Sequence, residues 1–307
     1  MKISICLPGF LRTWEYGKPS FLKNLVQEHD CDLFVHTYKQ NYFEYSAGKQ
    51  DVVYTEEQIL ENFKDLNLKK IVIEDRSELV SVLEKESEKY KDICNYSIDI
   101  PESSGDKKNI KLGIRIYDQL RKMYLCNNLR KEYEIENNFK YDLYVKTRFD
   151  VMYIDKVNWD NFVEDDLVYI GNSGTAGFPD DLVGIGKEGP MNAYMDRFAS
   201  LDKMCFTTVS KNDISTKNWY PHHGANIFPV SQFCAHDTLL RNLIYEGYDI
   251  RDGGFRNMLM RNENSILNWR PTTINGVNVQ ASNVVNGWIY EGNNAPFDVS
   301  NFNESLI

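Results

Sequence analysis

The sequence has no long apolar run and no excess of basic residues. Its 307 residues have a mean hydropathy of −0.49, and no apolar run approaches the ~20 residues that span a membrane. Lysine and arginine number 35 against 45 aspartates and glutamates, which gives a formal net charge of −10. A chain this acidic lacks the broad positive field that nucleic-acid binding requires. We therefore expect no membrane span and no nucleic-acid partner, and an anionic substrate must be met by a few local cations or a bound metal ion.

Cysteine is sparse, and its spacing excludes the common structural uses. No C-x-x-C pair and no cysteine–histidine cluster at zinc spacing is present. The cysteines are Cys6, Cys31, Cys94, Cys126, Cys205 and Cys234. The N-terminal run MKISICLPGF lacks the small-residue cleavage site of a signal peptide. Disulfide frameworks belong mainly to small secreted chains, so we expect reduced thiols and a cytoplasmic location.

The periodicity of the apolar residues predicts an α/β protein. Lys2–Leu7 and Cys31–Thr37 read as buried strands, and the helical spacing over Trp14–His29, with Pro19-Ser20 as a plausible helix start, separates them. Strand, helix and strand in this order open a parallel α/β unit. Further strands are predicted over Leu68–Glu74, Tyr141–Lys146, Leu167–Gly171 and Asp181–Gly186, and further helices over Thr55–Phe63, Ser77–Lys91, Ile110–Tyr133, Met191–Phe198 and His236–Glu246. Thr55–Phe63 begins with T-x-x-Q, which resembles a capping box.

No internal repeat, low-complexity tract or linker divides the chain. The tail after Asn264 is rich in asparagine and glycine and shows no clear pattern. We therefore predict a single α/β domain over residues 1–307, with a mixed, mostly parallel sheet flanked by helices and a more irregular C-terminal half.

Polar residues follow two of the predicted strands, at the ends where open α/β sheets bind ligands. Pro8-Gly9-Phe10-Leu11-Arg12 follows the first strand, and His36-Thr37 ends the second. Glycine allows close backbone approach, and arginine can bind a phosphate bidentately. The loop is neither a Walker sequence nor the G-x-G-x-x-G of dinucleotide folds. A plain turn with a surface arginine and a structural histidine are the alternatives.

A third strand end carries an acidic residue behind two cations. Lys146-Thr147-Arg148-Phe149-Asp150 directly follows the predicted strand YDLYV. A carboxylate there can hold Mg²⁺ or Mn²⁺, which take oxygen ligands and bridge to substrate phosphates. The lysine and arginine can neutralise the remaining diphosphate charge. A solvated, charged strand end is the alternative interpretation.

Taken in order, these segments resemble a known enzyme family. F-x-R after the first strand, D-L-F-V-H-T, a helix with Gln119 and Lys122, and Y-D-L-Y-V-K-T-R-F-D are similar to GT-A-type nucleotide-sugar glycosyltransferases. Large viruses and bacteria build surface glycans with such enzymes. The resemblance covers roughly residues 1–155, and more loosely 178–186 and 236–247. The family's acidic motif is D-x-D, and here Arg148 stands in place of the first aspartate, leaving Asp150.

The resemblance implies a GT-A-like (Rossmann-like) fold, with a nucleotide-binding half over 1–155 and an acceptor-binding half over 156–307. It implies transfer of a sugar from a UDP- or GDP-sugar to a glycan or lipid-linked acceptor. The residues implied in donor binding are Pro8, Gly9, Phe10, Arg12, His36, Thr37, Gln119, Lys122, Lys146 and Arg148. Asp150 would ligate Mn²⁺ or Mg²⁺, and His222 or its neighbour His223 would complete the metal shell.

An inverting transfer also needs a base for the acceptor hydroxyl. Asp181, in a pair of carboxylates before a predicted strand, and Asp237, at a helix start, are the two candidates. An aspartate at a helix start is also a routine N-cap, and a retaining course needs no such base. The sequence leaves two other functions open: a noncatalytic nucleotide- or carbohydrate-binding domain whose metal site is lost, and a nucleotidyltransferase.

Overall fold

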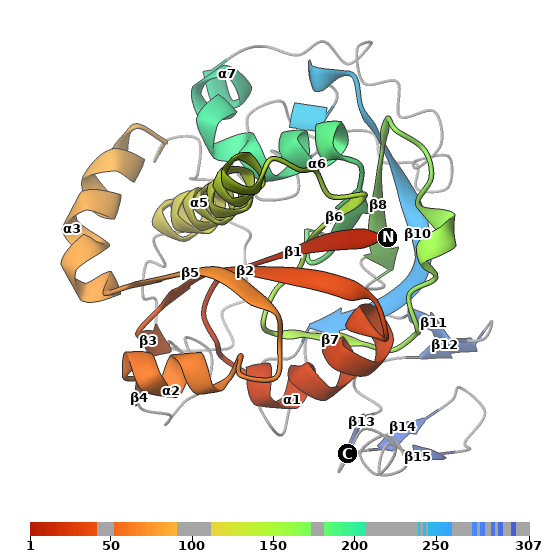
Figure 1. The fold of residues 1–307 in the computed structure, drawn as a ribbon. Coiled ribbons are helices and arrows are strands. Elements are labelled where there is room, and N and C mark those ends of the chain that lie inside the picture. Colours follow the sequence, from red (N-terminus) through yellow and green to blue (C-terminus); the bar gives the residue numbers. More distant parts are fainter. Residues whose placement is uncertain are drawn as a thin grey trace.

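The computed structural model describes the N-terminal part of the chain most fully. The described residues are 1–41, 52–90, 112–172, 181–206, 239, 242–243 and 245–259, with strand segments at 272–274, 277–279, 284–285, 288–290 and 296–298. They contain one large mixed sheet with helices on both faces (Figure 1). The α/β class and the mostly parallel sheet expected from the sequence are confirmed.

Eight strands form the large sheet in the order β5-β2-β1-β6-β9-β8-β10-β7. They are β1 (Lys2–Pro8), β2 (Asp30–Tyr38), β5 (Leu68–Glu74), β6 (Leu143–Lys146), β7 (Val151–Tyr153), β8 (Leu167–Asn172), β9 (Gly184–Gly186) and β10 (Asp249–Leu259). β1 is parallel to β2 and β6, β2 is parallel to β5, and β8 is parallel to β10. β9 runs antiparallel to β6 and β8, and β7 runs antiparallel to β10. Strands from both halves of the chain therefore share one sheet.

Helices pack on the large sheet, and several short strands form separate small sheets. The α-helices are α1 (Trp14–Ser20), α2 (Glu56–Glu61), α3 (Arg76–Ser87), α5 (Leu112–Asn137), α6 (Glu188–Met195) and α7 (Leu201–Phe206). Short sheets pair β3 (Gln40–Asn41) with β4 (Val52–Val53), β11 (Thr272–Ile274) with β12 (Val277–Val279), and β13 (Val284–Val285) with β14 (Trp288–Tyr290) and β15 (Pro296–Asp298). Within the described ranges, no helix is both long enough and apolar enough to cross a bilayer.

Two apolar layers hold the helices against the sheet. Successive side chains of a strand point to opposite faces, so Ile5 of β1 packs with Trp14 of α1, whereas Cys6 packs with Leu120 of α5. Figure 1 shows α1 and α2 on one face and α5, α6 and α7 on the other. Cys6, Cys31 and Cys126 are buried free thiols.

Local sequence features explain most of the element boundaries. The predicted capping box at α2 is confirmed, because Thr55 and Gln58 each bond the other's backbone N–H.

The prediction of a single regular helix over Trp14–His29 is wrong in detail. α1 passes through Pro19 and continues as a π-helix over Phe21–Val26. Proline has no N–H to donate to the preceding turn, which explains why the regular hydrogen-bond ladder changes at this point.

The packing of α1 against the sheet gives a stability prediction. A Cβ on Gly17 would lie 2.9 Å from the carbonyl oxygen of Val151, closer than a carbon can approach. Gly17→Ala is therefore expected to lower the free energy of unfolding by about 1–3 kcal/mol, although alanine favours an ordinary helix. Chemical denaturation measures this effect. Glu15→Ala, at an exposed position of α1, is the control and should cost less than about 1 kcal/mol. A Gly17→Ala protein as stable as the wild type would contradict the described packing.

Candidate functional site

Predicted site residues from the loops after β1, β2 and β6 gather where the strand order reverses. From β1 the chain builds β2 and β5 on one side, and it then adds β6 on the other side of β1. Ligands of open α/β sheets bind beyond the carboxyl ends of the strands at such a reversal. Cys6 of β1 is in register with Lys146 of β6, so the loops that follow these two strands start side by side.

The loop after β1 turns sharply and sends Arg12 across to the loop after β6. Gly9 has a φ of +136°, which glycine tolerates and other residues rarely adopt. Its N–H donates to the carbonyl of His36 at 3.0 Å, which ties the loop to the end of β2. Arg12 has a φ of 41°, and its Nη1 lies 2.9 Å from Oδ2 of Asp150.

Asp150 is buried beneath two arginines. Arg148 donates from Nε to Oδ1 at 2.8 Å and from Nη2 to Oδ2 at 2.9 Å, which is a bidentate pairing. Arg12 also donates to Oδ2. The side chain of Asp150 is 3% exposed, against 19% for Arg12 and 18% for Arg148. The ring of Phe149 packs in the apolar layer 5.5 Å from that of Trp14, and this contact anchors the loop.

A second layer of cations and rings adjoins this cluster. Lys122 of α5 places its Nζ 3.9 Å from the ring centroids of both Phe10 and Tyr38. Asp118, one helical turn earlier, accepts from the Tyr38 hydroxyl and lies 3.6 Å from Lys122. The guanidinium carbons of Arg12 and Arg76 lie 5.5 and 5.7 Å from the Phe10 ring. The Phe10 ring therefore has three cations around it.

The site is locally positive within an acidic protein. Four cationic side chains, those of Arg12, Arg76, Lys122 and Arg148, stand beside the carboxylates of Asp118 and Asp150. Burial lowers the pKa of Lys122 to about 8, with Asp118 opposing the shift and the two nearby arginines adding to it. Guanidinium groups in a planar fork suit phosphate oxygens. The arrangement favours a ligand with concentrated negative charge.

The residues around Asp150 do not fit the divalent cation that the sequence predicts. Both of its oxygens already accept from guanidinium groups. Mg²⁺ and Mn²⁺ need several oxygen ligands, and no group of three histidine, cysteine or acidic side chains converges anywhere in the described ranges. His222, the second predicted ligand, lies outside the described residues. The metal site at Asp150 therefore stays a prediction from the sequence.

His36 and Thr37 lie beneath the site in the core. Both side chains are almost fully buried, and neither His36 Nδ1 nor Thr37 Oγ1 has a hydrogen-bond partner among the described residues. Nε2 of His36 is 3.8 Å from Glu74, which is itself held bidentately by Arg121 at 2.8 and 2.9 Å. Burial lowers the pKa of His36 to about 4, so its imidazole is neutral at pH 7.

Lys146, Gln119 and Asp181 form a separate contact between β6, α5 and the segment before β9. The buried amine of Lys146 donates to the backbone carbonyls of Asp181 and, at 3.3 Å, of Leu182. Nε2 of Gln119 donates to Oδ2 of Asp181 at 2.6 Å. Lys146 and Gln119 thus hold the segment that carries Asp181. The structure places Asp181, one predicted base, against α5, whereas Asp237, the other, lies outside the described residues.

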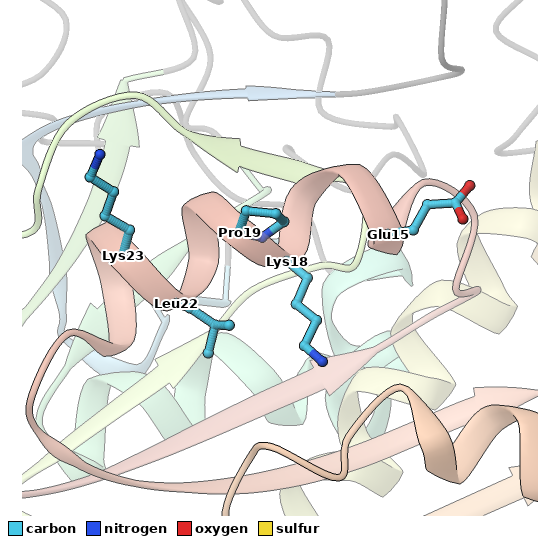
Figure 2. A pocket seen from close by; sticks show the side chains of 5 residues that line it. All are labelled: Glu15, Lys18, Pro19, Leu22 and Lys23. Atoms are coloured by element: carbon cyan, nitrogen blue, oxygen red, sulfur yellow. The ribbon is translucent and has the colours of Figure 1, made fainter. Parts of the chain in front are cut away.

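A hollow of about 420 Å³ on another part of the surface is not a candidate ligand site. It is lined by Glu15, Lys18, Pro19, Leu22 and Lys23, along α1 and the π-helix that follows it. Figure 2 shows the side chains of Lys18 and Lys23 pointing in opposite directions, away from a common centre. Charged groups that diverge cannot hold one ligand between them, so we assign the hollow no role.

Three members of the cluster were not singled out from the sequence. Asp118 lies four residues before Lys122 on one helix face, a spacing that could have revealed it. Tyr38 directly follows His36-Thr37, and Arg76 follows the end of β5. The strand-end rule that selected Arg12 would therefore also have selected Tyr38 and Arg76.

The buried neutral state of His36 predicts a pH-dependent stability. In the unfolded chain its pKa is near 6.5, whereas burial lowers it to about 4 in the fold. The unfolded chain therefore takes up a proton first, and stability is lost as the pH falls from about 6.5 towards 4, by on the order of 3 kcal/mol. Denaturation of wild type and His36→Gln at several pH values measures this, and His36→Gln should show the shallower loss. The control is His29→Gln, an exposed site; identical pH slopes for His36→Gln and wild type would contradict the assignment.

The lowered pKa of Lys122 predicts that the affinity of the site for anions depends on pH. Deprotonation above its pKa of about 8 removes one positive charge, so affinity for inorganic pyrophosphate should fall roughly 3- to 30-fold between pH 7 and 9. Calorimetric titration measures the fall. Lys122→Met should bind more weakly at pH 7 and vary less with pH, whereas Lys203→Met, which removes an exposed lysine paired with Glu246, should behave as wild type. An equal fall in Lys122→Met would refute the role of this lysine.

Comparison with known proteins adds no independent assignment. No protein-family model matches the chain, and no curated protein sequence shows significant similarity to it. The cationic cluster and the residue patterns in the sequence are therefore the features that bear on function.

Proposed function

We propose that the protein is a glycosyltransferase that moves a sugar from a nucleoside diphosphate donor to a glycan or lipid-linked acceptor. The observation that carries the proposal is the cluster of Arg12, Arg76, Lys122 and Arg148 at the strand-order reversal of an acidic chain. A diphosphate is the concentrated negative charge that such a cluster would bind. The ordered segments that resemble GT-A-type enzymes support the same choice.

The fold is compatible with the proposal at two points. The mixed, mostly parallel sheet with flanking helices is the arrangement that the resemblance to GT-A-type enzymes implies. The cluster also joins residues from both loops expected to contact the donor, since Arg12 and Asp150 meet across 138 positions of sequence. In this proposal the half-buried ring of Phe10 and its three cations form the wall of the donor site.

In the proposed reaction an acceptor oxygen bonds to the anomeric carbon, and the bond from that carbon to the diphosphate breaks. The electron pair of the broken bond stays on the diphosphate oxygen, where the arginines stabilise the developing charge. The acceptor proton passes to a carboxylate in an inverting course. Asp181 and Asp237 remain the proposed bases, and Asp181 is held by Gln119 at the edge of α5.

A donor screen tests this proposal. UDP- and GDP-sugars are incubated with the protein, and release of the nucleoside diphosphate is measured with and without glycan acceptors. Arg12→Gln should lower kcat/KM roughly 10- to 100-fold, because it removes a charged hydrogen-bond donor from the leaving group. Arg251→Gln is the matched control, since Arg251 is exposed and paired with Glu164.

Two other outcomes would replace the proposal. Tight binding of nucleotide sugars without transfer or hydrolysis would indicate a noncatalytic binding domain, which the occupied oxygens of Asp150 also suit. Cleavage of a nucleoside triphosphate with release of pyrophosphate would indicate a nucleotidyltransferase.

A further inference from the structure

The contacts of Asp150 assign it a different role from the one its motif suggests. Its carboxylate lies deeper than the two arginines, at 3% exposure against 19% and 18%. A ligand arriving from solvent therefore meets Arg12 and Arg148 before it meets the carboxylate. A metal ion could reach Asp150 only by displacing guanidinium groups that already bond both oxygens.

We propose that Asp150 is a positioning residue that holds Arg12 and Arg148 as a clamp for a diphosphate, which is then bound without a divalent cation. The inference rests on the proposed function, because the diphosphate is that of the sugar donor. It replaces the metal expected from the sequence with two cations that belong to the chain.

The charge of the clamp supports this role. Two guanidinium groups and one carboxylate carry one net positive charge, which equals that of a divalent cation on a single carboxylate. The first aspartate of a D-x-D motif would help to bind a metal ion and so bring positive charge to the site. Arg148, which stands in its place, supplies positive charge itself. Lys122 and Arg76 add further positive charge around the Phe10 ring.

The geometry also explains why a carboxylate is needed. Arg12 and Arg148 meet on one oxygen of Asp150, at 2.9 Å each. Two like charges brought this close repel each other, and a buried carboxylate between them offsets the repulsion. The bidentate pairing fixes the plane of the Arg148 guanidinium. Without Asp150, the two side chains would separate and lose their shared orientation.

Titration in the absence of metal tests the clamp. UDP, GDP and inorganic pyrophosphate are titrated into the full chain in EDTA and again in Mn²⁺. The wild-type Kd of the preferred ligand should agree within threefold between the two conditions. Arg12→Lys and Arg148→Lys, which keep the charge but lose the planar fork, should each weaken binding in EDTA by tenfold or more. Arg251→Lys is the control and should bind as wild type. A tenfold loss of wild-type binding in EDTA that Mn²⁺ restores would overturn the inference.

Asp150→Asn separates positioning from metal ligation by the sign of its effect. EDTA removes any divalent cation. If Asp150 served only as a metal ligand, Asp150→Asn would then leave ligand binding unchanged, or would strengthen it because the substitution removes a negative charge. If Asp150 positions the two arginines, Asp150→Asn should instead weaken binding threefold or more. Unchanged or tighter binding in a folded Asp150→Asn protein would overturn the inference. Circular dichroism checks the fold of this variant.

A measurement on the wild type does not depend on any variant folding. The Nε–H resonance of Arg148 should persist when Mn²⁺ is added to the ligand-free protein, because no ion binds beside it. Loss of this resonance through paramagnetic broadening would place the metal at Asp150 and overturn the inference. Failure of the proposed function looks different: the anions still bind in EDTA, but no donor sugar is transferred. If sugar transfer requires Mn²⁺, the proposed function is retained and the metal-free clamp is rejected.

Discussion

The parallel pairing of β1 with β6 is the constraint on which the candidate site depends. It aligns Cys6 with Lys146 and sets the loops after the two strands next to each other. Arg12 can then reach Asp150 across 138 positions of sequence. Because β2 flanks β1 on its other side, the N–H of Gly9 also reaches the carbonyl of His36. The pairing of the strand backbones alone therefore brings the ends of β1, β2 and β6 together.

Buried carboxylates let an acidic chain build a positive site. Asp150 and Asp118 each lie below the surface, and each holds cations that would otherwise repel one another. The rings of Phe10 and Tyr38 enclose the amine of Lys122 and separate it from water. Burial of this kind strengthens electrostatic interactions, and it also depresses the pKa of the lysine. The site therefore combines a cluster of cations with one lysine that can lose its proton near pH 8.

The elements that follow from local patterns were predictable, and those set by distant partners were not. Apolar runs revealed β1, β2, β5 and β6, and the T-x-x-Q of α2 formed its capping box. β10 was missed, because its Asp252-Gly253-Gly254 stretch reads as a turn, whereas the strand pairs with β8 on both sides of this irregularity, over Asp249–Asp252 and again at Arg256. In the site, Arg12 and Asp150 were expected separately near one ligand. Their direct contact follows from the β1–β6 register, and the burial of His36 follows from α5, neither of which a local pattern encodes.

A clamp made of side chains behaves differently from a metal ion when product leaves. A divalent cation can depart chelated to the nucleoside diphosphate, so its site must be refilled before the next donor binds. Arg12 and Arg148 stay on the chain, held by the carboxylate of Asp150. In the proposed cycle the same arginine geometry is therefore present again as soon as the product dissociates, with no ion to replace. The aspartate that remains of the acidic motif would then serve turnover by keeping the two arginines in place between one donor and the next.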